Sequence, residues 1–423
     1  MLNSQVVNYQ VEAWDTLQHL FKVKNINDHT LHFVAALAEK LDLERFKHAI
    51  NLSADAFPLI RSCFNESEKN CYWEDKGYRA EDMVKLLKTS NIDKSVNEFI
   101  CKEIDALNGP QLKAEVIRDD KKDVLCVSIN HMLCDAAGFK EYLYMLCEIY
   151  SNIEETPYSL STPMANRKIG QLVEAFSLRD KLKIMFSKND MFNLDHAKFE
   201  LEGNLNNPFI EKRMLSKEYF SKIKAYAKKN GATVNDVILT AYTRVLFQIF
   251  NRVIATTCTV DMRKYLPNHK AKGICNLCTN LTCDIGSEIG TEFQETLMKV
   301  KNTMDKEKSN IACIKSVFIM EKVFNALPYK VARDIIKKKF SNPQIAFTNI
   351  GILDITRLTF GKVAITEAYM TGSIKYSPYF QLAISTFDDQ PTLSVNLYGT
   401  QSDKNKISVF LDRLVQELQE AIL

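Results

Sequence analysis

Helix-like and strand-like segments are mixed along this chain, and the mixture limits the folds open to it. In the first half, an alternating segment at 112–117 and a mostly apolar segment at 124–129 flank Asp119–Lys122, which predicts a β-hairpin with a polar tip. Strands and helices in both halves predict an α/β or α+β fold. In the second half, polar breaks separate strand-like segments at 253–260, 277–285, 344–350, 363–369, 381–387 and 392–398.

Apolar residues at helical spacing predict helices between these strands. Apolar residues in 34–41 recur at i, i+3, i+4 and i+7, and a helix-like pattern continues from 43 to 50. Thr233 and Asp236 approximate a capping box for a helix at 234–250. This helix is apolar on nearly every side, so it should be buried. Further helices are predicted at 139–150, 216–229 and 407–422.

The length of the chain, 423 residues, suggests two domains at roughly 100–200 residues each. Residues 151–163 are rich in helix breakers, and a short amphipathic stretch follows at 172–186. We therefore predict an N-terminal lobe at 1–165, a connecting segment at 166–205 and a C-terminal lobe at 206–423.

Composition excludes several classes of protein. The formal net charge is +3, from 55 Lys and Arg against 52 Asp and Glu, so a nucleic-acid partner is not expected. The 11 cysteines lack a secreted-domain spacing, and the N-terminus lacks a signal-peptide pattern. No apolar run approaches the ~18 residues of a membrane span. We predict a cytoplasmic protein without a transmembrane segment.

Common catalytic motifs are missing from the sequence. There is no Walker A loop, no Gly-x-Gly-x-x-Gly and no Gly-x-Ser-x-Gly. Cys275 and Cys278 have a metal-like spacing, but neither a second close pair nor a suitably placed His accompanies them. We predict no metal site.

His131 differs from the other histidines because it lies between a predicted strand and a predicted helix. Asn130 ends the strand and Gly138 opens the helix, so His131 lies on a turn where α/β proteins place reactive side chains. A neutral imidazole can take a proton from an alcohol or amine that attacks a thioester, which is already activated. Asp135 could orient His131 as a triad acid does, turn away toward an arginine, or only cap the helix.

The segment Asn130–Gly138 resembles the HHxxxDG motif of the superfamily that includes chloramphenicol acetyltransferase, nonribosomal peptide condensation domains, plant BAHD acyltransferases and alcohol O-acetyltransferases. Asn130 replaces the first His, Ala136 replaces the Gly, and the plant-type Asp-Phe-Gly-Trp-Gly motif is missing. Other stretches agree in order and spacing with segments of these enzymes. Residues 41–61 resemble their N-terminal helix and following strand, and 231–237 resemble their helix after the crossover. Residues 260–276 resemble an arginine-containing segment with a glycine and an asparagine beyond it, and 347–351 resemble the Ser-Asn-x-Gly strand.

The resemblance implies two similar α/β lobes with a tunnel between them and His131 midway along it as the general base. It implies a structural ion pair between Asp135 and Arg263, with Arg61 as the alternative partner. The donor would be acetyl- or acyl-CoA as a co-substrate, no cofactor would be tightly bound, and the acceptor would be a small-molecule alcohol or amine. Possible substrate-binding residues are Asn276, Thr348 and Asn349.

Two alternatives remain open from the sequence. One is a stand-alone condensation-type protein that acts on groups bound to an acyl or peptidyl carrier protein. The other is a non-catalytic binding protein with this fold.

Overall fold

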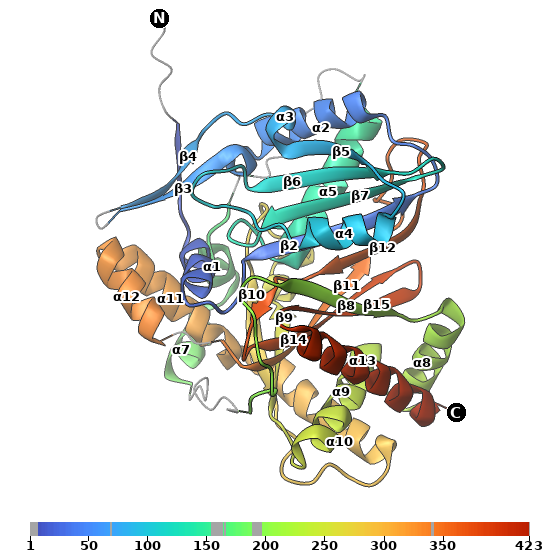
Figure 1. Ribbon diagram of the computed structural model, residues 1–423. Coiled ribbons are helices and arrows are strands. Elements are labelled where there is room, and N and C mark those ends of the chain that lie inside the picture. The colour runs from blue at the N-terminus through green and yellow to red at the C-terminus, as the bar shows by residue number, and fades with distance from the viewer. Residues whose placement is uncertain are drawn as a thin grey trace, which may run out of the picture.

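The computed structural model describes residues 7–67, 70–153, 164, 166–187, 197–339 and 342–422. Three β-sheets with helices packed around them make up this part of the chain (Figure 1). The α/β class predicted from the sequence is confirmed. None of the described helices is both long enough and apolar enough to span a membrane.

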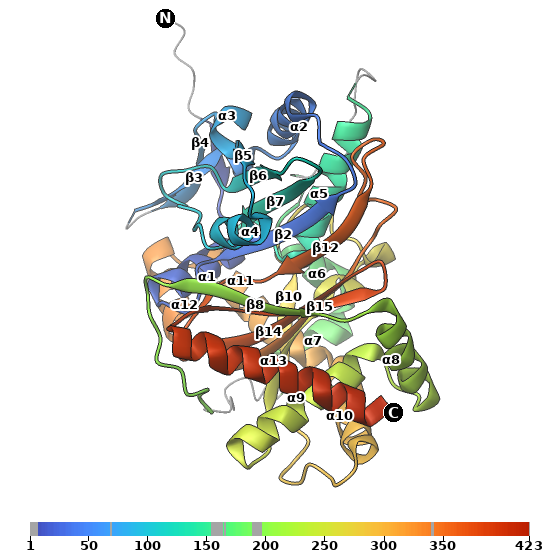
Figure 2. The ribbon, with the colours of Figure 1, turned by 45° about the vertical axis from the view of Figure 1, so that its right-hand side comes forward.

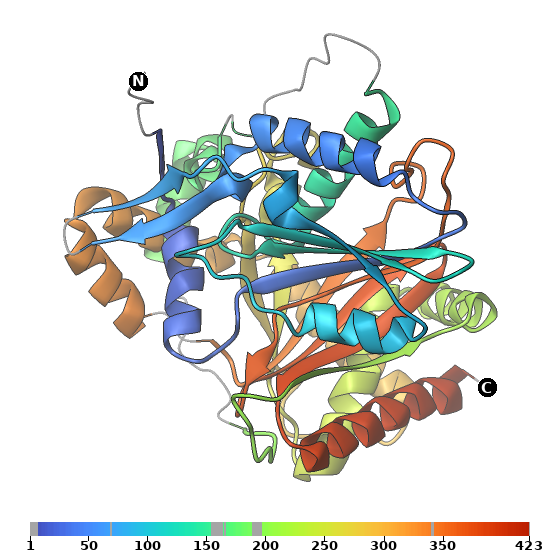
Figure 3. The ribbon, with the colours of Figure 1, turned by 45° about the horizontal axis from the view of Figure 1, so that its top comes forward.

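A five-stranded sheet forms the centre of the upper lobe in Figure 1. Its order is β12 (Ile365–Thr371), β2 (Thr30–Leu37), β7 (Asp123–Asn130), β6 (Leu112–Arg118) and β5 (Val84–Lys88). Strands β6 and β7 form the predicted hairpin. Helices α2 (Leu43–Ala56) and α5 (Ala136–Ser151) share a core with one face, and α4 (Ile92–Ile100) packs on the other, as Figure 3 shows from above.

A seven-stranded sheet forms the centre of the lower lobe. Its order is β10 (Cys278–Cys283), β9 (Thr256–Asp261), β11 (Ile345–Leu353), β14 (Phe380–Phe387), β15 (Gln390–Tyr398) and β13 (Lys375–Tyr376), with β8 (Pro208–Met214) also paired to β15. Helices α8 (Lys217–Lys229), α9 (Val234–Phe250), α10 (Phe293–Ser309) and α13 (Gln401–Ile422) lie together below this sheet (Figure 2).

Smaller elements lie at one end of the molecule. A three-stranded sheet has the order β1 (Asn8–Gln10), β4 (Cys71–Asp75) and β3 (Ser62–Glu66). Near it lie α1 (Ala13–Val23), α11 (Lys315–Ala326) and α12 (Tyr329–Lys339) (Figure 1). The remaining α-helices are α3 (Ala80–Met83), α6 (Gly170–Ala175) and α7 (Leu178–Phe186); 3₁₀ turns cover Pro58–Arg61, Met262–Tyr265, Pro267–His269 and Ile311–Ile314.

One strand crosses between the lobes. β12 belongs to the second half of the sequence, yet it pairs antiparallel with β2 in the five-stranded sheet (Figure 2). The chain then enters the seven-stranded sheet at Lys375, so it passes between the two sheets within Gly372–Ile374. The predicted lobe boundaries at 165 and 205 follow the order of the sequence, so they do not include this pairing of β12 with the sheet of the first lobe.

The helix predicted at 34–41 is wrong, because residues 30–37 form β2. This strand lies between β12 and β7 and is buried along nearly its whole length. A strand that is buried on both faces has no reason to alternate apolar and polar residues, so its apolar positions matched a helical spacing. In the stretch 41–61, which resembles an N-terminal helix and the strand after it, α2 ends at Ala56 and a 3₁₀ turn occupies Pro58–Arg61. The strand that follows, β3, begins only at Ser62.

The capping box predicted in the second half is present. Thr233 and Asp236 form a reciprocal capping box at the start of α9. α8 ends at Lys229, and Gly231 beyond it has a φ of 61°, in the left-handed region that glycine adopts without strain.

Candidate active site

His131 directly follows β7, at the carboxyl end of a central strand. Its backbone N–H donates to the carbonyl of His29 at 2.7 Å, which fixes the turn against the residue that precedes β2. Helix α5 begins five residues later at Ala136. The turn that carries His131 is therefore tied to the five-stranded sheet at one end and to a long buried helix at the other.

Asn130, which replaces the first His of the family motif, holds the start of the turn through its side-chain amide. Its side-chain N–H donates to Gln111 Oε1 at 2.7 Å, and its Oδ1 accepts from the backbone N–H of Met132 at 2.9 Å. The side chain is completely buried. Asn130 thus shapes the turn on the side of the sheet.

Asp135 and Arg263 form the ion pair expected from the sequence. Arg263 Nη1 donates to Oδ2 at 2.9 Å and Nη2 donates to Oδ1 at 3.0 Å, in a two-bond fork. The carboxylate also accepts from the backbone N–H groups of Gly138 at 2.9 Å and Leu277 at 2.7 Å. The alternative partner, Arg61, is instead paired with Asp75 at 2.9 Å.

Asp135 therefore has two of the three roles left open by the sequence, since it caps α5 and pairs with an arginine. Asp135 and Arg263 are only 5% and 7% exposed. Burial alone would raise the pKa of Asp135, but the guanidinium of Arg263 and the two N–H donors outweigh it and lower the pKa. The carboxylate is fully engaged in these contacts, which differ from those of a triad acid bonded to the imidazole.

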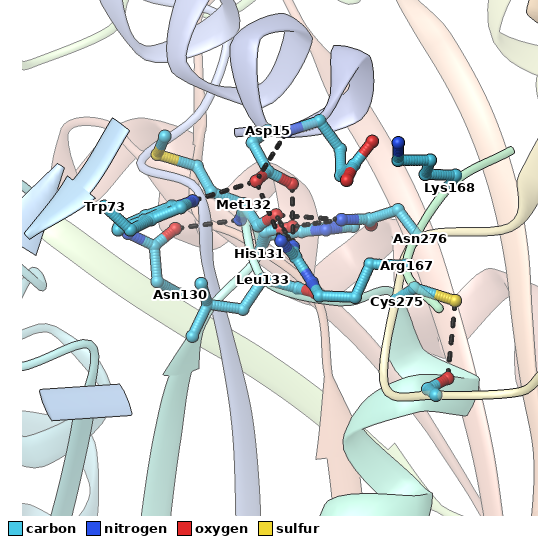
Figure 4. Close-up of polar contacts among 12 residues, drawn as sticks. Asp15, Trp73, Asn130, His131, Met132, Leu133, Arg167, Lys168, Cys275 and Asn276 are labelled. Carbon is cyan, nitrogen blue, oxygen red and sulfur yellow. Dashed lines mark hydrogen bonds and ion pairs between the residues drawn. The ribbon is translucent and has the colours of Figure 1, made fainter. Parts of the chain in front are cut away.

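Arg167 is a second buried arginine at the turn, and it was not among the site residues predicted from the sequence. It binds both carboxylate oxygens of Asp15 at 3.1 and 2.8 Å, and donates to the carbonyls of Met132 at 3.4 Å and Leu133 at 3.1 Å. Trp73 Nε1 also donates to Asp15 at 2.9 Å (Figure 4). Arg167 lies in the predicted connecting segment, where no motif or periodicity marked it.

Asn276 holds the turn from the second lobe. Its Nδ2 donates to the carbonyls of His131 at 3.0 Å and Met132 at 3.1 Å (Figure 4). The residue is buried, and its amide contacts the backbone of the turn rather than lining the cavity beside it. Asn276 was predicted as a possible substrate-binding residue, and in the structure its amide supports the backbone of the His131 turn.

A cavity of about 520 Å³ lies beside His131. Both lobes line it, because α1 and the His131 turn contribute from one side and β9, β10 and β11 from the other. Thr348 and Asn349 line it from β11. Asn349 Nδ2 donates to Asn235 Oδ1 at 3.0 Å, and Asn349 Oδ1 accepts from the N–H of Gly351 at 2.9 Å. His131, Thr348 and Asn349 thus share one cavity.

The surroundings of His131 favour the neutral imidazole. Burial lowers its pKa from the usual histidine value of 6.5, and the ammonium of Lys375 lowers it further. The charge of Asp135 and the amide of Asn276 oppose this effect. Nδ1 is buried and has no hydrogen-bond partner among the described residues. Near neutral pH the ring is therefore in the form that can accept a proton.

The residues that the structure describes contain no cluster of potential metal ligands. No group of three or more His, Cys, Asp or Glu side chains in this part of the chain could hold a metal ion. Cys275, half of the metal-like pair in the sequence, lies 3.4 Å from the carbonyl of Gly273 and 3.8 Å from the Gln171 amide.

Comparison with known sequences gives one distant match. No family model matches the chain. Over 301 residues, 67% of this chain, the sequence is 21% identical to bacitracin synthase 3 from Bacillus licheniformis. The chain spans only 4% of the length of that protein.

Comparison with solved structures gives matches along nearly the whole chain. The first condensation domain of the calcium-dependent antibiotic synthetase, in complex with a substrate analogue, has a TM-score of 0.72 at 11% identity and covers 99% of this chain and 98% of its own. Trichothecene 15-O-acetyltransferase from Fusarium sporotrichioides has a TM-score of 0.71 at 14% identity, covering 99% and 95%. The epimerization domain from the third module of tyrocidine synthetase B has a TM-score of 0.66 at 13% identity, covering 99% and 96%.

These likenesses define the fold. The chain has the fold shared by these condensation domains and the trichothecene acetyltransferase, and this is the fold that the motif around His131 predicts. At such low identities these likenesses show the fold alone.

Proposed function

We propose that this protein is an acyltransferase that moves an acyl group from a thioester to an alcohol or amine, with His131 as the general base. The observation that carries the proposal is the position of His131. It lines a cavity shared by both lobes, while the carboxylate of Asp135 is bound to Arg263. The imidazole is thus available to a substrate, and its backbone is fixed on several sides.

The proposed reaction needs one proton acceptor and no protein nucleophile. His131 takes the proton from the acceptor hydroxyl or amine as its oxygen or nitrogen forms a bond with the thioester carbonyl carbon. The tetrahedral intermediate collapses, the carbon–sulfur bond breaks, and the thiolate takes the proton from His131. The imidazole is then neutral again, so each turnover releases one ester or amide and one free thiol.

Acetyl- or acyl-CoA as a co-substrate is the simplest donor for this reaction, with a small-molecule acceptor. The likeness to condensation domains supports a second candidate, a condensation-type reaction on acyl or peptidyl groups carried by a carrier protein. Both candidates use the same proton transfer at His131. They differ in whether the thioester arrives on free CoA or on a carrier-bound phosphopantetheine.

A thiol-release assay separates these candidates. Acetyl-CoA and longer acyl-CoA thioesters are offered with a panel of alcohols and amines, and the same acyl groups are offered on a phosphopantetheinylated carrier protein. Release from free CoA supports the first candidate, and release only from the carrier supports the second. Acceptor-dependent thiol release from neither donor would favour the non-catalytic alternative.

The role of His131 is tested in the same assay. His131→Ala should fold normally and lower turnover by roughly 10²–10⁴-fold, the usual contribution of a general base. His48→Ala is the matched control, because His48 is exposed on α2. A folded His131→Ala variant with near-normal turnover would contradict the proposal.

A further inference from the structure

The cavity beside His131 contains a lysine whose ammonium has no partner among the residues that the structure describes. Lys375 is 8% exposed and lines the cavity. Its ammonium forms neither a hydrogen bond nor an ion-pair contact with any residue that the structure describes. Lys140, which also lines the cavity, instead donates to the carbonyls of Ile350 at 2.9 Å and Ile352 at 3.3 Å. A buried, unpaired ammonium is destabilising, so its presence in a cavity calls for a counter-charge.

Lys375 is held close to the catalytic turn by one segment of backbone. Asp28 N–H donates to the carbonyl of Ile374 at 3.1 Å, and Ile374 N–H donates to Asp28 Oδ1 at 2.9 Å. The next residue, His29, accepts from the backbone N–H of His131 at 2.7 Å. Ile374, the chain neighbour of Lys375, and His131 are therefore bonded to two adjacent residues, Asp28 and His29.

A second donor lies on the same segment. Ser373 is 5% exposed and lines the cavity, and its hydroxyl has no hydrogen-bond partner in the part of the chain that the structure describes. It is two residues before Lys375, in the stretch where the chain crosses between the sheets. A hydroxyl and an ammonium on one short segment are both donors, which matches an acceptor group with two oxygens.

Asp28 compensates only part of the charge of Lys375. Burial raises the pKa of Asp28 to about 7 and lowers the pKa of Lys375 to about 8, although Asp28 opposes the second shift. Asp28 Oδ2 is itself buried without a partner, and Asp28 does not contribute to the cavity wall. Lys375, unlike Asp28, lines the space where a substrate would lie.

We propose that Ser373 and Lys375 bind a carboxylate group of a substrate beside His131. The inference rests on the proposed function, because it places this substrate in the acyl-transfer cavity. One ammonium and one hydroxyl supply two donors and one positive charge, which suits a carboxylate. That carboxylate belongs either to the acyl chain of the donor or to the acceptor.

Calorimetric titration with paired probes tests the subsite without requiring turnover. The donor arm compares succinyl-CoA with butyryl-CoA, and the acceptor arm compares 4-hydroxybutanoate with 1,4-butanediol. In at least one pair, the wild-type protein should bind the carboxylate about 10- to 100-fold more tightly than its neutral analogue, as expected for hydrogen bonds to a charged group. Lys375→Met should remove this preference and leave binding of the neutral analogue unchanged.

Lys113→Met is the matched control. Lys113 is a half-buried lysine on β6 whose ammonium donates to the carbonyl of Glu103 at 2.6 Å, away from the cavity wall. This variant removes the same charge from the protein and should keep the preference of the wild type. A preference in the donor arm assigns the carboxylate to the acyl chain, and one in the acceptor arm assigns it to the acceptor.

Two results would overturn the inference. The first is a wild-type protein that shows no preference in either arm, or a Lys375→Met variant that keeps it. The second is a large fall in the melting temperature of ligand-free Lys375→Met, which would make Lys375 a structural partner of Asp28. The thiol-release assay reports separately on acyl transfer. If the protein catalyses transfer but shows no preference for the carboxylate, only the carboxylate subsite is rejected. If it shows the preference but no transfer, only the proposed function is rejected.

Discussion

Side chains from two distant parts of the chain donate to the backbone around His131. Asn276 donates to the carbonyls of His131 and Met132, and Arg167 donates to those of Met132 and Leu133. These bonds fix the path of the turn and leave the imidazole without a bond to Asp135. Its protonation is therefore governed by burial and by the charges near it.

The pH dependence of turnover should reflect this environment. The pKa of His131 is lowered below 6.5, mainly by burial, and the imidazole must be neutral to accept a proton. We expect kcat/KM to rise with pH through this lowered pKa and to level off at neutral pH, with half-maximum below 6.5. The charged groups that act on the ring are Asp135, which raises the pKa, and Lys375, which lowers it. A half-maximum above 6.5 in the pH profile would contradict the assignment of His131.

The Asp135–Arg263 pair should contribute strongly to stability because both groups are buried. Asp135→Ala and Arg263→Ala should each lower the free energy of unfolding by about 3–5 kcal/mol, since each leaves the other charge buried and unpaired. The double variant should lose less than the sum of the two single losses. Denaturant unfolding measures all three values.

An exposed ion pair provides the control for this cycle. Arg357 and Glu141 are 2.9 Å apart and 43% and 49% exposed, so Arg357→Ala should cost only about 0–1 kcal/mol. Strictly additive losses for Asp135→Ala and Arg263→Ala would mean that the two groups do not stabilise each other.

At the scale of elements, helix α5 approaches the segment before β10 very closely at Gly138. A Cβ atom at this position would lie 2.8 Å from the carbonyl oxygen of Cys275 and 2.7 Å from Cβ of Cys134. Asn276 follows directly and holds the His131 turn. The absence of a side chain at residue 138 therefore lets the first turn of α5 and the Asn276 support come together.

Gly138→Ala should disturb this contact. The added methyl group has to displace backbone of the 275–276 segment, at a cost of about 1–3 kcal/mol as for other overpacked sites. We expect lower turnover and a lower melting temperature. Gly109→Ala is the control, because its Cβ would meet only the carbonyl of Asp105 at 3.5 Å, an ordinary contact. Equal behaviour of the two variants would show that the approach at Gly138 is not needed.

The elements that the sequence predicted well are those whose pattern has one clear cause. The hairpin of β6 and β7 had alternating residues and a polar tip, and α9 had a capping box and a long apolar run. β2 was mistaken for a helix because a strand buried on both faces has no period of two. β13 has only two residues, too few for any periodicity.

Only the residues of the candidate site that lie in a recognisable sequence pattern were predicted. His131, Asp135 and Arg263 were found because they lie in short motifs that resemble those of known acyltransferases. Arg167 and Lys375 lie in segments without such a motif. Their importance comes from burial and from neighbours far away in the sequence, which only the folded chain reveals.

At the scale of the whole molecule, the two lobes share a hydrophobic core. The cluster around the five-stranded sheet contains Phe33 and Phe139 from the first half, together with Ile350, Met370 and Phe387 from the second. β12 also completes the edge of that sheet next to β2. The first lobe therefore depends on segments more than 200 residues away along the chain.

This exchange of β12 predicts that the lobes unfold together. Met370 is fully buried on β12, so Met370→Ala should lower the free energy of unfolding by about 2–5 kcal/mol, the usual cost of such a core truncation. Because β12 pairs with β2 and the chain continues from it directly into β13 and β14, the loss of stability should reach both sheets.

Hydrogen exchange followed by mass spectrometry in increasing denaturant tests this expectation. The amides of β7 and α9 should lose protection at the same denaturant concentration, and Met370→Ala should move both to a lower concentration. Val409→Ala on α13, where the side chain is 52% exposed, should leave both within about 0.5 kcal/mol of the wild type. If β7 instead lost protection in Met370→Ala while α9 kept its wild-type protection, the lobes would be separate units and the crossing strand would not couple them.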